Sequence, residues 1–116
     1  MYSITEAMVA WLAARGYDAS THPRRDAEPP FVTVERAGGH VEDMVDHPSI
    51  ALQAWGRTEA EAEAMANELR LALLTGPLPV GVHKVAVNSG PYRFYDAATR
   101  FPRYQIALDI TSQLTE

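Results

Sequence analysis

The sequence predicts an α+β domain in which two helices pack on one face of a mainly antiparallel, four-stranded sheet. Two segments carry apolar residues at helical spacing, and four others have the alternation or β-branched content of strands. Their order is helix, strand, strand, helix, strand, strand, which is typical of α+β architecture. A chain of 116 residues with 47% hydrophobic residues suits a single domain, residues 1–116, with one modest core.

The first helix is predicted at the N-terminus and ends near Arg15. Ser3 and Glu6 have the spacing of a capping box, in which each side chain satisfies a free N–H group of the first turn. Gly16 is well placed to end the helix. The residues expected to face the sheet are Ile4, Met8, Trp11 and Leu12.

Tyr17 to Pro30 is predicted to be an irregular connector with room for a short edge strand at its start. It contains three prolines, and each restricts the residue before it to extended geometry. Phe31 to Arg36 is predicted as the first full strand, ending at the turn signal Gly38-Gly39. The second strand is predicted over Ser49 to Trp55.

The central helix is predicted over Thr58 to Leu74. Thr58 and Glu61 form a second capping box, and the acidic residues of the first turn suit the positive end of the helix dipole. Gly76 and Pro77 end the helix. The apolar stripe expected to face the sheet consists of Ala62, Met65, Ala66, Leu69 and Leu73.

Two strands are predicted after this helix, over Val80 to Asn88 and over Arg103 to Thr111. The last strand alternates strictly, as expected when one face of a sheet is buried. Its inward residues are predicted to be Tyr104, Ile106, Leu108 and Ile110. We expect Leu69 and Leu73 to be buried against Ile106 and Leu108.

Two long connections, Gly38–Pro48 and Ser89–Pro102, separate the strands of each pair. Both are longer than a tight hairpin requires. Loops of this length in compact domains are usually functional or mobile, which makes these two segments the candidate contact regions.

The composition excludes several classes of function. A net charge of −5 argues against a dedicated nucleic-acid binder and against docking on anionic membrane. The absence of cysteine excludes disulfides, a thiolate nucleophile and cysteine-bound zinc. Apolar runs are too short to span a bilayer and the N-terminus lacks the features of a signal peptide, so we expect a soluble protein made in a cytoplasm.

The densest polar cluster consists of His40, Glu42, Asp43, Asp46 and His47. Imidazoles and carboxylates can hold a divalent metal, but this spacing matches no helical ligand motif, so an exposed loop with no metal is predicted. His83 would need a carboxylate or nucleophile beside it to act as a general base, and no activated-serine pattern is present. No catalytic residue and no cofactor are therefore predicted.

Aromatic and basic residues alternate near the C-terminal end: Tyr92, Arg93, Phe94, Tyr95, Arg100 and Arg103. Such a mixture can stack on single-stranded nucleic acid, and it is equally the composition of a protein–protein interface. The acidic net charge favours the protein interface.

Four stretches taken together resemble the tail terminator, or tail completion, proteins of long-tailed bacteriophages. They are PPFVTVERAGG, DHPSIALQAWG, TEAEAEAMANELRLAL and NSGPYRFYDAATRFPRYQIALDIT, in this order. The resemblance spans nearly the whole chain and is carried by the order and spacing of these stretches. It implies a non-enzymatic neck protein of the virion, made in the host bacterial cytoplasm.

The resemblance also implies partners. Family members form a homo-oligomeric ring, usually a hexamer, that caps the tail tube protein, ends tube polymerisation and joins the tail to the head–tail connector proteins. DNA would pass through the lumen without specific binding, and no membrane is involved. Head-to-tail subunits need two different complementary patches. The sequence offers the acidic His40–His47 loop and the aromatic, basic Tyr92–Tyr104 segment.

Two alternatives remain open at this point. A small-molecule-binding module or small enzyme would use the His40–His47 segment together with His83, converging in one pocket. A nucleic-acid-binding accessory protein would use Arg93, Arg100 and Arg103, and its binding would weaken steeply with salt.

Overall fold

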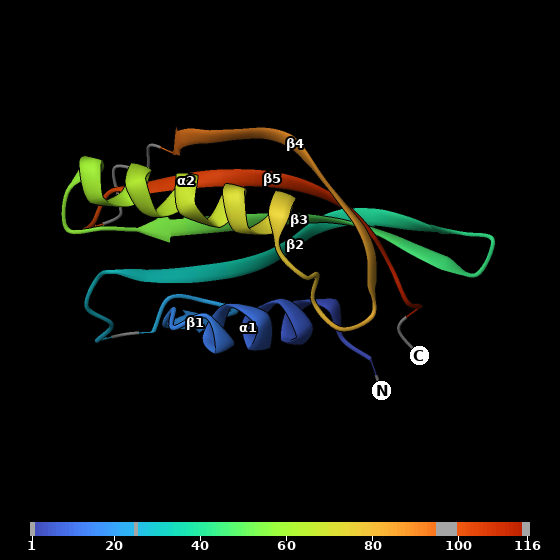
Figure 1. The fold of residues 1–116 in the computed structure, drawn as a ribbon. Coiled ribbons are helices and arrows are strands. Elements are labelled where there is room, and N and C mark those ends of the chain that lie inside the picture. The colour runs from blue at the N-terminus through green and yellow to red at the C-terminus, as the bar shows by residue number, and fades with distance from the viewer. Residues whose placement is uncertain (1, 25, 95–99, 115–116) are drawn as a thin grey trace.

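The computed structural model of the chain describes residues 2–24, 26–94 and 100–114, which form two helices and five strands (Figure 1). In chain order the elements are α1 (Ile4–Ala14), β1 (Ala19–Ser20), β2 (Phe31–Glu42), β3 (Val45–Trp55), α2 (Glu59–Thr75), β4 (Val82–Phe94) and β5 (Arg103–Ser112). The predicted α+β class is confirmed. Among the described residues, neither helix is both long and apolar enough to cross a membrane.

The sheet of the described residues has five strands in the order β1-β2-β3-β5-β4. β1 runs parallel to β2, and the other neighbours are antiparallel. The prediction of four strands is therefore wrong. The sheet has a fifth strand, β1, which follows the first helix in the chain. That strand is the short edge strand anticipated at the start of the connector. A strand of two residues, Ala19–Ser20, is too short to show any alternation in a sequence.

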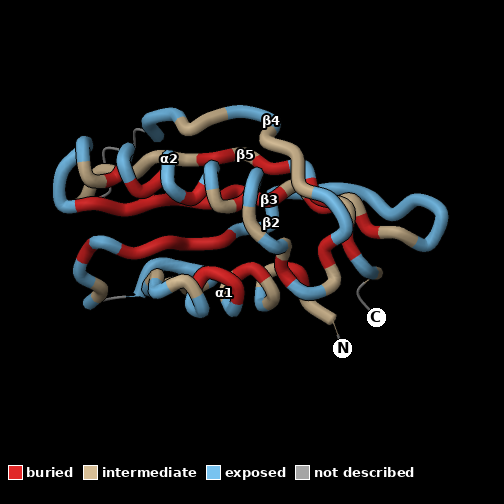
Figure 2. The backbone as a smooth tube through the Cα atoms, viewed as in Figure 1, coloured by how far each residue is buried: buried red, intermediate tan, exposed pale blue. Residues whose placement is uncertain are grey.

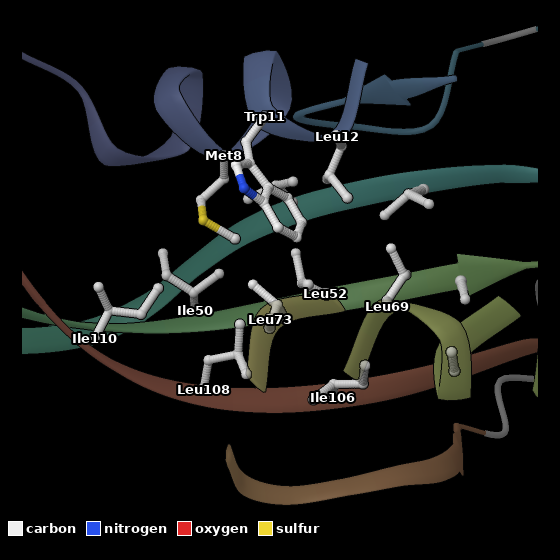
Figure 3. Packing of buried hydrophobic residues seen from close by; sticks show 14 of the residues in the cluster. Met8, Trp11, Leu12, Ile50, Leu52, Leu69, Leu73, Ile106, Leu108 and Ile110 are labelled. Atoms are coloured by element: carbon white, nitrogen blue, oxygen red, sulfur yellow. The ribbon is translucent and has the colours of Figure 1, made fainter. Parts of the chain in front are cut away.

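Both helices cover the same face of the sheet, and the hydrophobic core lies between them and the strands (Figure 3). α1 lies along β1 and β2, whereas α2 lies across β3, β4 and β5. The apolar stripes predicted for the two helices are all buried. Leu69, Leu73, Ile106 and Leu108 belong to one core cluster, as predicted.

The N-terminal caps follow the predicted chemistry, but neither capping box is complete, since in the described part of the chain no bond from the Ser3 N–H group to the Glu6 carboxylate accompanies the first cap. Ser3 Oγ accepts a hydrogen bond from the Glu6 N–H group at 3.3 Å, and Thr58 Oγ1 accepts from the Glu61 N–H group at 3.1 Å. The Glu61 carboxylate reaches back to the N–H group of Arg57 at 2.7 Å, one residue before the expected position. Both helices are therefore capped at their N-termini by their own side chains.

The predicted Gly38–Pro48 loop is wrong, because these residues extend β2 and β3 into a two-stranded ribbon. Its turn consists of two residues, Asp43 and Met44, with φ of 52° and 64°. Gly38 and Gly39 stay within the strand, where a Cβ on Gly39 would collide with the carbonyl of His47. The ribbon projects beyond the sheet (Figure 2), and its β2 half is exposed throughout. The buried residues of its β3 half are Asp46 and Pro48, so no apolar alternation marks this strand in the sequence.

β4 is also longer than predicted and ends at Phe94 instead of Asn88. Its register against β5 shifts three times within the described pairs, once after Val82 and once on each side of Ser89. Each shift moves the following side chains out of phase with those before, which hides the strand from a period-two search. Much of the predicted Ser89–Pro102 connection is therefore strand, while residues 95–99 lie outside the described part.

Candidate functional surface: the ribbon and the second face of the sheet

The face of the sheet that points away from α1 and α2, called here the second face, carries most of the polar and aromatic residues singled out in the sequence. On β5 it receives the side chains that alternate with the core residues, as predicted. One row across the sheet consists of Phe31, Trp55, Arg103 and Phe94. The next consists of Thr33, Gln53, Gln105 and Tyr92.

The first row forms an aromatic end. The rings of Phe31 and Trp55 are stacked with centroids 5.4 Å apart. The Arg103 guanidinium lies 4.7 Å from the Trp55 ring centroid and 4.3 Å from that of Phe94, so it stabilises the row through cation–π contacts. Beside this row is a groove of about 330 Å³, lined by Pro23, Arg24, Asp26, Ala27, Glu28, Phe31, Trp55, Arg100 and Phe101.

The second row is joined by a chain of hydrogen bonds. Trp55 Nε1 donates to Thr33 Oγ1 at 3.0 Å, and Thr33 Oγ1 donates to Gln53 Oε1 at 2.6 Å. Gln53 Nε2 donates to Gln105 Oε1 at 3.0 Å, and Gln105 Nε2 donates to Tyr92 Oη at 2.6 Å. Thr33, Gln53 and Trp55 are buried, so their polar atoms need these partners. This chain fixes the side chains of four neighbouring strands.

The hydrogen-bond chain was not found from the sequence. Thr33, Gln53 and Gln105 lie far apart along the chain, and each is an ordinary polar residue of an alternating strand. Only the register between β2, β3 and β5 brings them side by side. Without knowledge of that register, no feature of the sequence distinguishes these residues from other polar strand residues.

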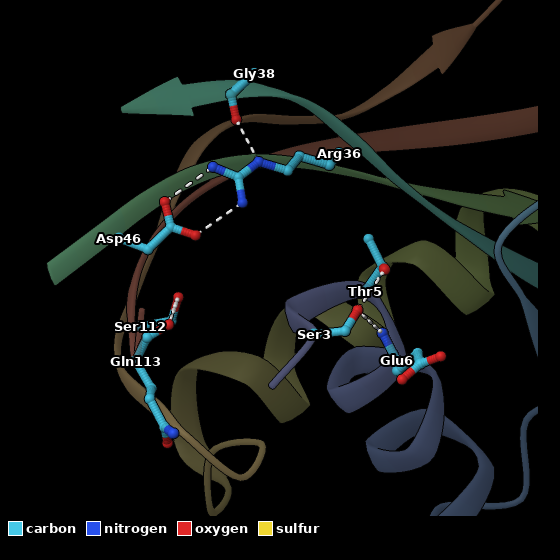
Figure 4. A network of polar contacts seen from close by, with 8 residues as sticks. All are labelled: Ser3, Thr5, Glu6, Arg36, Gly38, Asp46, Ser112 and Gln113. Carbon is cyan, nitrogen blue, oxygen red and sulfur yellow. Dashed lines mark hydrogen bonds and ion pairs between the residues drawn. The ribbon is translucent and has the colours of Figure 1, made fainter. Parts of the chain in front are cut away.

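At the other end of the sheet, the ribbon (Gly38–Pro48) is fixed at its base by an ion pair (Figure 4). The Arg36 guanidinium donates to both carboxylate oxygens of Asp46 at 2.7 and 2.9 Å, and to the Gly38 carbonyl at 3.1 Å. Hydrogen bonding from Arg36 lowers the pKa of Asp46, although burial opposes this effect. Asp46 is only 2% exposed, so its predicted place in an exposed contact surface is corrected.

Above this ion pair, His40 and His47 form a cross-strand pair. Their rings are stacked with centroids 4.9 Å apart. Glu42 lies on the same side of the ribbon, with a carboxylate oxygen 3.6 Å from His40 Nε2. The structure therefore brings together three of the five residues of the predicted polar cluster, while Asp43 is in the turn and Asp46 faces Arg36.

A shallow groove of about 240 Å³ adjoins the histidine pair on the second face. Its described lining includes His40, His47, Ser49, Lys84, Ala86, Asp109, Ile110 and Thr111. His83 is not among these residues and is exposed at an irregularity of β4. This groove therefore does not bring His83 together with the His40–His47 segment, as the enzyme alternative requires.

The predicted arginines have different environments. Arg93 forms an ion pair with Glu59 at the start of α2, with a distance of 2.6 Å. Arg103 lies between two rings within the sheet, whereas Arg100 is exposed beside the Phe101 ring. Tyr92 and Phe94 are 37% and 36% exposed at the edge, and Tyr95 lies outside the described residues.

A comparison with protein-family models finds no match, and a comparison with curated proteins finds no relative of this chain. What the protein does is therefore inferred from its own surfaces and from the resemblance described above.

Proposed function

We propose that the chain is a structural assembly subunit that forms a closed ring with copies of itself. Following the resemblance, the ring would contain six subunits, cap the tail tube of a long-tailed phage and end tube polymerisation. It would then join the tail to the head–tail connector, with DNA passing through its lumen. The support from the structure lies mainly in one residue, Met44 at the tip of the ribbon.

Met44 occupies a position that suits its side chain poorly. It is 76% exposed and has a φ of 64°, a backbone region in which L-residues other than asparagine and aspartate are disfavoured. A two-residue hairpin turn after an aspartate would normally place glycine here. Local strain and an exposed apolar side chain together favour a contact made by that side chain.

The neighbours of Met44 support the same interpretation. Val41 is 56% exposed on the ribbon, and Glu42 and Asp43 add exposed negative charge. An apolar tip flanked by carboxylates is complementary to an aromatic groove that carries an exposed arginine. The groove beside Phe31, Trp55 and Arg100 has this character, although Asp26 and Glu28 also line it.

The tip and this groove lie at opposite ends of the same sheet, since Phe31 begins β2 and Glu42 ends it. The molecule measures 42 Å along its longest axis. Two different surfaces at opposite ends cannot meet within one subunit, but they can meet between neighbours. Repeated head to tail, such a contact closes into a ring or continues as a filament, depending on the rotation between subunits. We therefore assign the groove to the ribbon tip of a second copy.

The test compares variants of the full chain by native mass spectrometry and by tail length in a phage complementation assay. Met44→Gly relieves the turn while removing the side chain, so it should fold at least as stably as the parent but lose ring formation. Met44→Asp should behave in the same way. Val80→Asp is the matched control, because Val80 is 82% exposed and belongs neither to the ribbon nor to the groove lining.

Rings of parental mass and tails of normal length from both Met44 variants would overturn the assigned contact. Loss of rings with Val80→Asp to the same extent would show that added negative charge, and not the tip contact, controls assembly. Restored assembly when Arg100→Glu is combined with Glu42→Arg would identify the partner charges across the boundary.

A further inference from the structure

The ribbon carries a second cluster, which shares only Glu42 with the proposed contact between subunits. The ligand atoms of His40, Glu42 and His47 all lie within 4.8 Å of one another. We propose that these three side chains bind a divalent transition-metal ion of the zinc, nickel or copper class on the surface of the ribbon.

The three residues converge because of the antiparallel register. His40 and His47 are directly opposite each other on β2 and β3, and side chains of such pairs share a face. Glu42 is two residues beyond His40, so it lies on the same face of the same strand. The two-residue turn and the Arg36–Asp46 ion pair fix this register from both sides.

The donor set determines the class of ion. Two imidazoles and one carboxylate suit zinc, copper and nickel, whereas magnesium prefers an all-oxygen, octahedral site. Two donors on one tetrahedral zinc are about 3.3 Å apart, given bonds of roughly 2.0–2.2 Å. The 3.6 Å between His40 Nε2 and the Glu42 carboxylate is close to this value. The stacked His47 ring needs a change of rotamer to complete the set, which its partly exposed position permits.

The surroundings leave the ion accessible. His40 and Glu42 side chains are each 67% exposed, so the ion would keep open positions for water or for a donor from another molecule. Of the charged residues in the adjoining groove, Asp109 favours a cation and Lys84 opposes it. These two charges offset each other, so binding rests on the three ligands themselves.

Helical ligand spacing does not reveal this site. His40 and His47 are seven residues apart, which has no meaning as a helical ligand motif but is natural for a cross-strand pair around a two-residue turn. The same residues therefore become a ligand set once the segment is a hairpin.

The test is a calorimetric titration of the metal-free full chain with zinc chloride, followed by thermal unfolding with and without the ion. The parent should bind a single ion in the micromolar range, and bound zinc should raise the midpoint of unfolding. His40→Ala and His47→Ala should each weaken binding about tenfold or more and remove the rise in midpoint. Glu42→Gln should weaken binding with both imidazoles in place.

His83→Ala is the matched control, because it removes an exposed strand histidine outside the cluster and should leave binding unchanged. Circular dichroism of each variant confirms that the fold is retained. Equal zinc binding by the parent and His40→Ala would overturn the proposal, as would an equal loss in His83→Ala. Magnesium chloride at the same concentrations should give no binding heat, and competition by magnesium would contradict the assigned donor class.

Discussion

The two faces of this sheet are both buried near their centre, but they are held together by different forces. The face under α1 and α2 is filled by aliphatic side chains such as Leu52, Leu69 and Ile106. The second face instead joins Trp55 and Thr33 into a chain of hydrogen bonds across four strands. Aliphatic packing tolerates substitution by volume, whereas a buried polar chain depends on every member having its partner.

The helix-covered face should show the largest loss of stability. Leu69→Ala removes a fully buried side chain and leaves a cavity, so it should lower the free energy of unfolding by about 2–5 kcal/mol. Urea denaturation followed by circular dichroism measures this loss. Leu71→Ala is the control on the same helix, because Leu71 is 62% exposed and its truncation should change stability by no more than about 0.5 kcal/mol. An equal effect of the two would mean that α2 presents a different face.

The base of the ribbon should show the next largest effect, and one that depends on pH. Asp46→Asn weakens the bonds from Arg36 and should cost about 1.5–3 kcal/mol at neutral pH, as expected for hydrogen bonds between charged groups. The pKa of Asp46 is lowered in the fold, so its contribution is present above its ordinary value of 3.8 and is lost as pH falls through the folded pKa.

The difference in unfolding free energy between the parent and Asp46→Asn should therefore shrink as acid is added below pH 3.8. Denaturant titrations over a pH series measure it. Asp109→Asn is the control, because Asp109 is exposed and its change should be small at every pH. A difference that stays constant into strong acid would show that the Arg36–Asp46 pair contributes no charge-dependent stability.

On the second face, Thr33→Val keeps the shape of the side chain and removes its hydroxyl. Trp55 Nε1 then loses its acceptor and Gln53 Oε1 its donor, so the cost should be about 1–3 kcal/mol despite the extra methyl group. Thr111 is half-buried on the same face and serves as the control. Thr111→Val should change stability by less. If Thr33→Val proved as stable as the parent, the hydrogen-bond chain would be a consequence of the register and not a support for it.

The smallest expected effect is at the aromatic end. Arg103→Lys keeps the charge but loses the flat guanidinium between Trp55 and Phe94, which should cost about 0.5–1 kcal/mol. Arg100→Lys on the exposed rim should cost nothing measurable. Equal thermal midpoints for the two variants would show that the position of Arg103 between the rings adds no stability.

The fold could be predicted largely because its covered face obeys simple periods. The stripes of α1 and α2 repeat at helical spacing, and the inward residues of β5 alternate, so each identified its own element. The ribbon and the end of β4 escaped prediction for a physical reason. The β2 half of the ribbon is exposed on both sides and has no need to alternate, and the buried residues of its β3 half are Asp46 and Pro48, which are not typical core residues. The bulged strand β4 changes phase.

The surface residues were predicted less well than the core. Residue type alone identified His40, His47 and Arg103, but it could not show that two of them face each other or that the third lies between rings. Asp46 was misplaced because a charged residue in a polar stretch is normally exposed. Its burial depends on Arg36, ten residues earlier, and the pairing of β2 with β3 sets that meeting.

The irregular course of β4 bears on whether this protein can aggregate through the edge of its sheet. β4 is the last strand of the described sheet, so one of its edges pairs with β5 and the other pairs with no strand of that sheet. Unpaired strand edges can recruit further chains into fibres. Three register shifts and Pro91, which has no N–H group, interrupt the regular ladder that a fibre would need to copy. Continuous growth of a sheet along this edge is thereby disfavoured.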